Sequence, residues 1–196
     1  MTDPLFSREH PNETLLDPDE RRQLLLPHIA TRAQLNEAEQ ENIADATAWA
    51  FARRRDVLKE SFLLALHKRM LGQVWRWAGT IRNSDRNIGM AFHQIRPQLR
   101  LLIEDSRYWL ENGTFPPDEI AVRFHHRLVL IHPFPNGNGR HGRLAADLLA
   151  VRLGQARFTW GRVNLVEPEE TRRRYIRALR SADAHDIRPL LDFARS

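Results

Sequence analysis

The chain of 196 residues contains no cysteine. This absence excludes disulfide bonds, catalysis by a thiolate and zinc sites built from cysteine. No apolar run approaches the length needed to span a bilayer. The first eight residues are polar and include Pro4, so they do not resemble a signal peptide. We therefore expect a cytoplasmic protein that does not enter a membrane.

Acidic residues are in the minority, with 25 Asp and Glu against 30 Lys and Arg, and the formal net charge is +5. The basic triplets at 53–55 and 172–174 lie beside acids and lack interleaved aromatic residues. This pattern favours solvated helix faces over direct binding of nucleic acid. A hydrophobic content of 42% over this length suits one domain with a sizeable core.

Helical periodicity runs through most of the chain after a weakly periodic arm at residues 1–30. Thr31 and Gln34 have the spacing of a capping box. We predict helices over 32–53, 56–71, 97–113, 117–131 and 144–153, with two more opening at Pro168 and Pro189. The turn-rich segment 82–92 predicts a short β-hairpin. The expected fold is therefore all-α (mostly helical) with one hairpin, and residues 31–196 form a single domain.

The most informative segment is the run from His132 to Arg143, which reads HPFPNGNGRHGR. Apolar helical patterns flank it on both sides, so we expect a helix, a loop and a second helix. The first N–H groups of the second helix have no partners within the helix. With Gly137 and Gly139 beside them, these donors can form an anion nest for phosphate oxygens.

Three side-chain types in this run complete the inventory for polyphosphate chemistry. Asn138 can add an amide, and Arg140 and Arg143 lie three residues apart, so both can reach the same phosphates. His132 can accept a proton from an incoming hydroxyl. The run therefore predicts a nucleotide-phosphate site with a general base beside it.

The remaining histidines and the tryptophans raise two separate questions, a metal site and the hydrophobic core. His125 and His126 are adjacent, so they point to different helix faces and lack a metal-ligand spacing such as i, i+4. We therefore expect no histidine-metal site that joins them to His132 and His141. The tryptophans at 75, 77 and 109 are expected in the core.

The run resembles the signature of the Fic (filamentation induced by cAMP) family, His-Pro-Phe-x-Asp/Glu-Gly-Asn-Gly-Arg-x-x-Arg. Leu66-His67 and the stretch 74–82, VWRWAGTIR, resemble the family's upstream motif. Together these cover roughly residues 55–155, the expected Fic core. The segments 16–20 and 35–43 further resemble the subfamily called mobile mystery protein B. The resemblance implies the all-α Fic fold, with an inhibitory-like helix near 32–53 before the core and further helices over 156–196.

The resemblance implies a protein adenylyltransferase, a nucleotidyltransferase that moves AMP from ATP to a Ser, Thr or Tyr hydroxyl of a target protein. His132 is then the general base. Gly137, Asn138 and Gly139 form the anion hole, and Arg140 and Arg143 bind the distal phosphates. Mg²⁺ normally bridges the α- and β-phosphates.

Three further roles follow from the same resemblance. The hairpin corresponds to the family's flap, with Ile88, Gly89 and Met90 as the contacts to the target segment. The pattern Glu37-x-x-x-Glu41-Asn42 resembles the family's inhibitory motif and makes Glu41 a candidate brake on Arg143. Asn136 stands where the family has an acid that faces Mg²⁺, and an amide oxygen is a weaker ligand for this hard cation.

Alternative functions stay open at this point. Other Fic-like proteins remove AMP from a target, or transfer UMP, phosphate or phosphocholine. A weakly active or non-catalytic module of the toxin–antitoxin type is a third interpretation. Proteins of the resembled subfamily tend to be encoded beside a helix-turn-helix partner, mobile mystery protein A, which is a candidate regulator.

Overall fold

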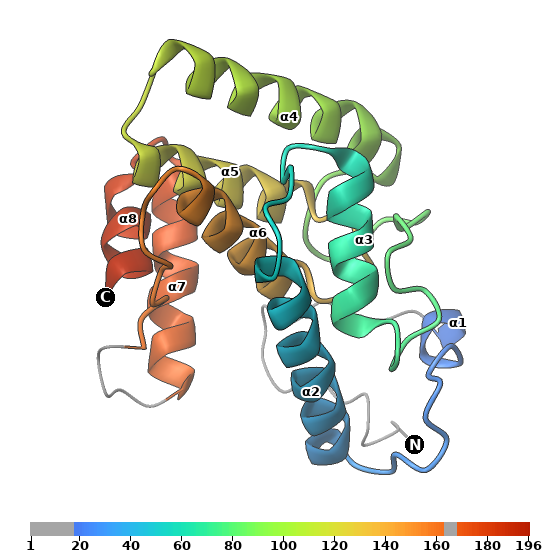
Figure 1. Cartoon of the computed structure of the whole chain (residues 1–196). Coiled ribbons are helices and arrows are strands. Elements are labelled where there is room, and N and C mark those ends of the chain that lie inside the picture. The colour runs from blue at the N-terminus through green and yellow to red at the C-terminus, as the bar shows by residue number, and fades with distance from the viewer. Residues whose placement is uncertain (1–17, 163–167) are drawn as a thin grey trace.

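The computed structural model describes residues 18–162 and 168–196, and regular structure in this part of the chain is helical (Figure 1). The elements are α1 (Pro18–Arg21), α2 (Arg32–Phe51), α3 (Glu60–Leu71), the 3₁₀ turn η2 (Phe92–Gln94), α4 (Ile95–Asn112), α5 (Pro117–Ile131), α6 (Asn138–Arg152), α7 (Pro168–Asp183) and α8 (Arg188–Arg195). One isolated β-bridge joins Leu24 to Trp75. The all-α prediction is confirmed for the described residues, whereas the predicted hairpin is not present as strands.

Local sequence signals explain several helix ends. Thr31 and Gln34 form the expected capping box at the start of α2. Gly113 ends α4 in the left-handed conformation that glycine adopts without strain. The helix predicted from residue 56 begins only at Glu60. The predicted first turn is not helical, because the Asp56 carboxylate accepts the N–H of Leu58 at 3.3 Å and so stabilises a non-helical backbone there.

The centre of the fold is the pair α5 and α6, which pack on each other along their lengths (Figure 1). α4 and α8 also pack on α5, and α2 and α3 pack on α6. Alanines at 145, 146 and 150 are completely buried on α6, and their small side chains permit this close packing. The loop between α5 and α6 therefore starts and ends in the most constrained part of the molecule.

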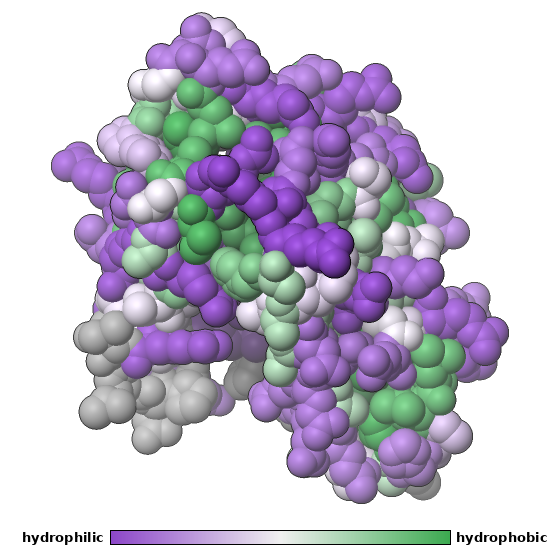
Figure 2. Space-filling model, viewed as in Figure 1, coloured by the Kyte–Doolittle hydropathy of each residue, from purple (hydrophilic) through white to green (hydrophobic). Residues whose placement is uncertain are grey.

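The outer surface carries the charge. Figure 2 shows hydrophilic side chains over most of one face, with apolar ones in a few separate patches. Trp75 and Trp77 are buried, as predicted, and Trp109 packs partly buried against the core. Within the described residues, no helix is both long and apolar enough to cross a membrane. Of the predicted N-terminal arm, residues 1–17 lie outside the described part of the chain.

Candidate active site

His132 lies at the junction between α5 and the loop. It ends the helix with a left-handed backbone, φ 55° and ψ 60°, which is uncommon for a residue with a side chain. Its Nδ1 lies 3.3 Å from the carbonyl oxygen of Val129. Because a carbonyl only accepts, the neutral ring carries its proton on Nδ1, and Nε2 is the basic nitrogen.

The environment of His132 favours the neutral imidazole. Only 5% of the residue is exposed. Burial lowers its pKa to about 4, and the positive charges of Arg82 and Arg86 act in the same direction, against the bond to Val129. At neutral pH the ring can therefore accept a proton, as a general base must.

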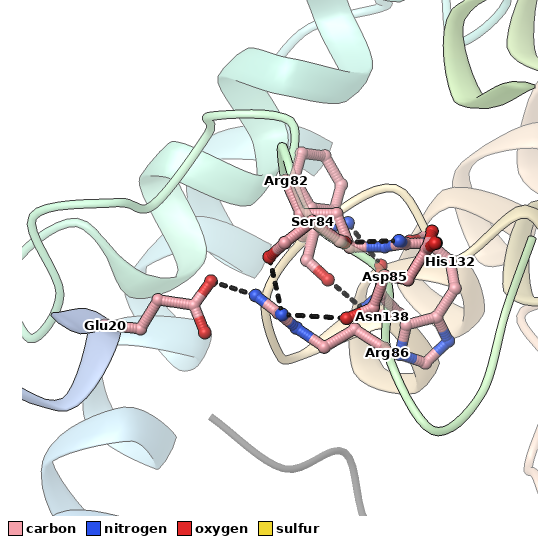
Figure 3. A network of polar contacts seen from close by, with 8 residues as sticks. Glu20, Arg82, Ser84, Asp85, Arg86, His132 and Asn138 are labelled. Atoms are coloured by element: carbon pink, nitrogen blue, oxygen red, sulfur yellow. Dashed lines mark hydrogen bonds and ion pairs between the residues drawn. The ribbon is translucent and has the colours of Figure 1, made fainter. Parts of the chain in front are cut away.

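Arg82 ties the segment 83–91 to His132. Its Nε donates to the carbonyl oxygen of His132 at 2.7 Å and its Nη1 to that of Ser84 at 2.8 Å. Its Nη2 donates to the carbonyl of Met90. Figure 3 shows this guanidinium between the loop and the segment it holds. Because one buried side chain satisfies carbonyls at both ends of the segment, the segment closes without pairing as a hairpin.

The three predicted target-contact residues lie on this segment. Gly89 lies against His132, since a Cβ added to it would come 2.3 Å from the Cβ of His132. Its φ is +92°, so this position requires glycine on two grounds. Ile88 and Met90 flank it and are half-buried. The predicted contacts are thus next to the candidate base, carried by an irregular segment.

A buried ion pair joins this segment to α1. Arg86 donates to Glu20, and the two side chains are only 2% and 11% exposed. Arg86 also donates to the Ser84 hydroxyl at 2.8 Å (Figure 3). The contact has no local signal in the sequence, because Glu20 and Arg86 are 66 positions apart.

The loop itself is closed by Asn138. Its side-chain oxygen accepts the N–H of Phe134 at 2.9 Å, and its side-chain nitrogen donates to the carbonyl of Phe134 at 2.8 Å. These two bonds give the Asn138 side chain a structural use in closing the loop. Its Nδ2 has a second N–H, and its backbone N–H lies at the start of α6, so the predicted role of Asn138 at phosphate stays a prediction.

A close approach requires glycine at 137 but not at 139, which lies in the first turn of α6. Gly137 has φ +78°, and an added Cβ would lie 2.6 Å from Leu71 and 3.3 Å from His67. At Gly139 the nearest atoms are the Nη1 of Arg143 at 3.8 Å and the hydroxyl of Tyr175 at 3.9 Å. The open start of α6 thus has Arg143 next to it, as an anion site needs.

Arg140 is held by Glu39, an acid that no sequence motif indicates. Its Nη1 donates to Glu39 on α2 at 2.5 Å, and Glu39 also accepts the indole N–H of Trp75 at 2.6 Å. Glu39 is 6% exposed. It joins α2 to the segment 74–82, which carries Trp75, and to Arg140 on α6.

Glu41 does not form the expected contact with Arg143. It is exposed and makes no ion pair with a described residue. Two positions along a helix turn a side chain by about 200°, so Glu41 faces away when Glu39 faces the loop. Asn42 is buried instead and joins α2 to α3, donating to the carbonyl of Arg69 and accepting from the N–H of Gln73, both at 3.0 Å.

Arg143 contacts Tyr175 on α7. The centre of its guanidinium lies 5.2 Å from the middle of the Tyr175 ring. The Tyr175 hydroxyl lies 3.0 Å from the Nε2 of His125, while His126 is turned to Asp183 at 2.8 Å. Burial lowers the pKa of His125 to about 3, so this ring is neutral. α7 therefore supports Arg143 on α6, and the sequence of α7 does not indicate this role.

A magnesium ion held by the protein fits these residues poorly. Asn136 supplies one amide oxygen, which already accepts the N–H of Gly137 at 2.6 Å. No group of three or more His, Asp and Glu side chains within the described residues is placed to hold a metal. The usual carboxylate ligand of Mg²⁺ is missing from position 136.

The geometry thus joins a neutral imidazole, an open helix start and two arginines around one loop. Residues 57–150, which include all of them, match the Fic/DOC family. The chain contains a Fic/DOC family domain. The matched residues end before α7, the helix whose Tyr175 contacts Arg143.

Known relatives agree with this assignment. The Caenorhabditis elegans protein adenylyltransferase fic-1 is 31% identical over 147 residues, which cover 72% of this chain and 27% of that protein. The chain thus spans about a quarter of the length of the curated relatives it matches. A solved structure of C. elegans Fic-1 (residues 134–508) has a TM-score of 0.59 at 27% identity, with 80% and 47% of the two chains covered.

The fold alone is shared with more distant proteins. The BepC protein of Bartonella tribocorum, solved with bound AMPPNP, has a TM-score of 0.70 at 16% identity. The comparison covers 91% of this chain and 97% of that one. The all-helical Fic fold is therefore established for the described part of this chain.

Proposed function

We propose that this Fic-domain protein transfers AMP from ATP to a hydroxyl of a target protein. The observation that carries the proposal is the position of His132, a buried neutral imidazole beside the open N-terminus of α6. Relatives named protein adenylyltransferases, at 31% to 33% identity, support it.

In the proposed reaction the target hydroxyl attacks the α-phosphorus of ATP. A new O–P bond forms, the bond to the bridging oxygen breaks, and pyrophosphate leaves with the bond electrons. Nε2 of His132 takes the hydroxyl proton. The backbone N–H groups at the start of α6 hold phosphate oxygens, and Arg143, with Arg140, neutralises the departing charge.

The loop does not suit a Mg²⁺ held by the protein, so no step depends on one here. At position 136 the chain offers an amide in place of a carboxylate. This departure favours one second candidate function, a weakly active or non-catalytic module. A cytoplasmic location, the mobile mystery protein B subfamily and a helix-turn-helix partner stay predictions from the sequence.

The test is a labelling assay. The protein is incubated with α-labelled ATP, Mg²⁺ or Mn²⁺ and a host lysate, and labelled proteins are separated by size. We expect transfer by the wild type and a loss of about 10²–10⁴-fold in His132→Ala. His126→Ala, on the same helix, is the matched control and should keep the wild-type rate.

Two outcomes would contradict the proposal. Binding of ATP without label transfer by the wild type would favour the non-catalytic module. Equal transfer by wild type and His132→Ala would remove His132 from the chemistry.

A further inference from the structure

A histidine outside the candidate site contacts the loop that follows His132. His67 lies on α3, is completely buried and contacts two segments that are far from it in the sequence. The backbone N–H of Gly79 donates to its Nδ1 at 2.9 Å, and its Nε2 lies 3.0 Å from the carbonyl oxygen of Asn136. The ring thus connects the segment 74–82, which carries Trp75 and Trp77, to the loop between α5 and α6.

These two contacts fix the protonation state of His67. A backbone amide only donates, so Nδ1 carries no hydrogen. A carbonyl only accepts, so Nε2 carries it. Burial holds the pKa of His67 well below its ordinary value, and the positive charge of Arg140 acts in the same direction. Only the neutral ring with its hydrogen on Nε2 can make both bonds.

Packing allows the ring little freedom to move. His67 stacks on Phe134 with 3.7 Å between ring centres and 13° between the planes. A Cβ on Gly137 would lie only 3.3 Å from its Nε2. His67 therefore touches the loop at Phe134, Asn136 and Gly137, and a shift of the ring would move all three.

The hydrogen bond from His67 to Asn136 constrains more than the carbonyl that accepts it. The carbonyl of Asn136 and the N–H of Gly137 belong to one planar peptide unit, so fixing one fixes the direction of the other. That N–H donates to the side-chain oxygen of Asn136 at 2.6 Å. The orientation of the Asn136 side chain therefore depends on His67, as does the entry of the chain into α6.

We propose that His67 is a positioning residue that, through the Asn136–Gly137 peptide, sets the phosphate-facing groups of the loop. The proposal rests on the proposed function insofar as those groups bind nucleotide, but its effect on loop order can be measured without nucleotide.

The experiment compares His67→Phe, His67→Gln and the control His126→Phe in the full chain. Phenylalanine keeps the stack on Phe134 but loses both hydrogen bonds, and glutamine keeps an amide donor. Amide hydrogen exchange is followed in peptides from 133–141 and, for reference, from α4. Mg²⁺–ATP affinity is measured by calorimetry, and KM and kcat by label transfer.

We expect His67→Phe to speed exchange in 133–141 by about 10-fold or more with α4 unchanged, because the lost bonds restrain only the loop. Its affinity for Mg²⁺–ATP should fall about 10-fold, with KM rising more than kcat falls. His67→Gln should recover part of both effects, and His126→Phe should match the wild type.

Equal exchange and equal affinity in His67→Phe would overturn the proposal, as would faster exchange over the whole chain, which marks a general loss of stability. If His67→Phe does not fold, His67→Gln decides by the same measurements. If the wild type neither binds ATP nor transfers label, the proposed function fails, whereas the exchange measurement still decides the role of His67.

Discussion

Replacing Glu39 and Glu41 by alanine, one at a time, tests which acid of α2 matters. The two residues are of the same type, on the same helix and two positions apart. Glu39 is buried and accepts from Trp75 and Arg140, whereas Glu41 is exposed. The structure therefore predicts a large difference between two substitutions that look equivalent in the sequence.

The magnitude follows from the two bonds of Glu39. A hydrogen bond to a charged group contributes about 1.5–3 kcal/mol, and a buried donor left without a partner costs about 1–3 kcal/mol. Trp75 is 2% exposed, so its N–H would lose the carboxylate of Glu39 at a position out of reach of solvent. Arg140 is one third exposed and can be rehydrated, which reduces its share. Alanine returns a few tenths of a kcal/mol in helix propensity.

We expect Glu39→Ala to lower the free energy of unfolding by about 3 kcal/mol. At this chain length that is a fall in Tm of about 6–12 °C. Glu41→Ala should stay within about 0.5 kcal/mol of the wild type. The assay is urea unfolding followed by tryptophan fluorescence, with the thermal midpoint from circular dichroism.

A double-mutant cycle with Trp75→Phe separates the indole bond from the rest. The coupling between Glu39→Ala and Trp75→Phe should be about 1–3 kcal/mol. Equal stability losses in Glu39→Ala and Glu41→Ala would refute the reasoning. So would a rise in label transfer confined to Glu41→Ala, because an exposed residue without contact to Arg143 cannot restrain it.

Three more outcomes follow from the site. Asn136→Asp should tighten Mg²⁺–ATP binding in calorimetry, since it supplies the carboxylate that this hard cation prefers; equal or weaker binding would contradict a metal role for position 136. Gly89→Ala should destabilise the protein by about 1–3 kcal/mol and reduce label transfer, because its Cβ would overlap His132 and its φ is +92°; a crystal structure with an unmoved segment would count against this. The free energy of unfolding should fall by several kcal/mol as pH drops from about 6.5 toward 4. Four buried histidines have a lowered pKa in the folded state, so in this range they bind protons only in the unfolded chain. A free energy of unfolding that does not change with pH in this range would contradict the prediction. These histidines are His67, His125, His132 and His141.

The sequence predicted the elements whose signals are local. The capping box at Thr31, the proline that opens α5 and the glycine that ends α4 each act within a few residues, and each was correct. The prediction of a hairpin was wrong because the side chain of Arg82 donates hydrogen bonds to backbone carbonyls, including those of Ser84 and Met90, that paired strands would otherwise use.

The candidate site was predictable only where one short run contains it. His132, Arg140 and Arg143 surround the loop as expected, yet their supports come from elsewhere in the chain. Glu39 reaches Arg140 across 101 positions, and periodicity alone could not prefer it to Glu41. Tyr175 likewise supports Arg143 from α7, where nothing local indicates a contact. Contacts of this kind are decided by tertiary packing, which a single sequence does not display.

The left-handed backbone of His132 has a consequence for natural variation. For a residue with a Cβ this conformation costs roughly 1–2 kcal/mol relative to glycine, and here φ is 55°. Backbone energetics alone would therefore drive mutation at this position toward glycine or asparagine once the imidazole ceased to be needed. We therefore expect histidine at 132 to be kept where the imidazole is used, and glycine or asparagine to appear there where it is not.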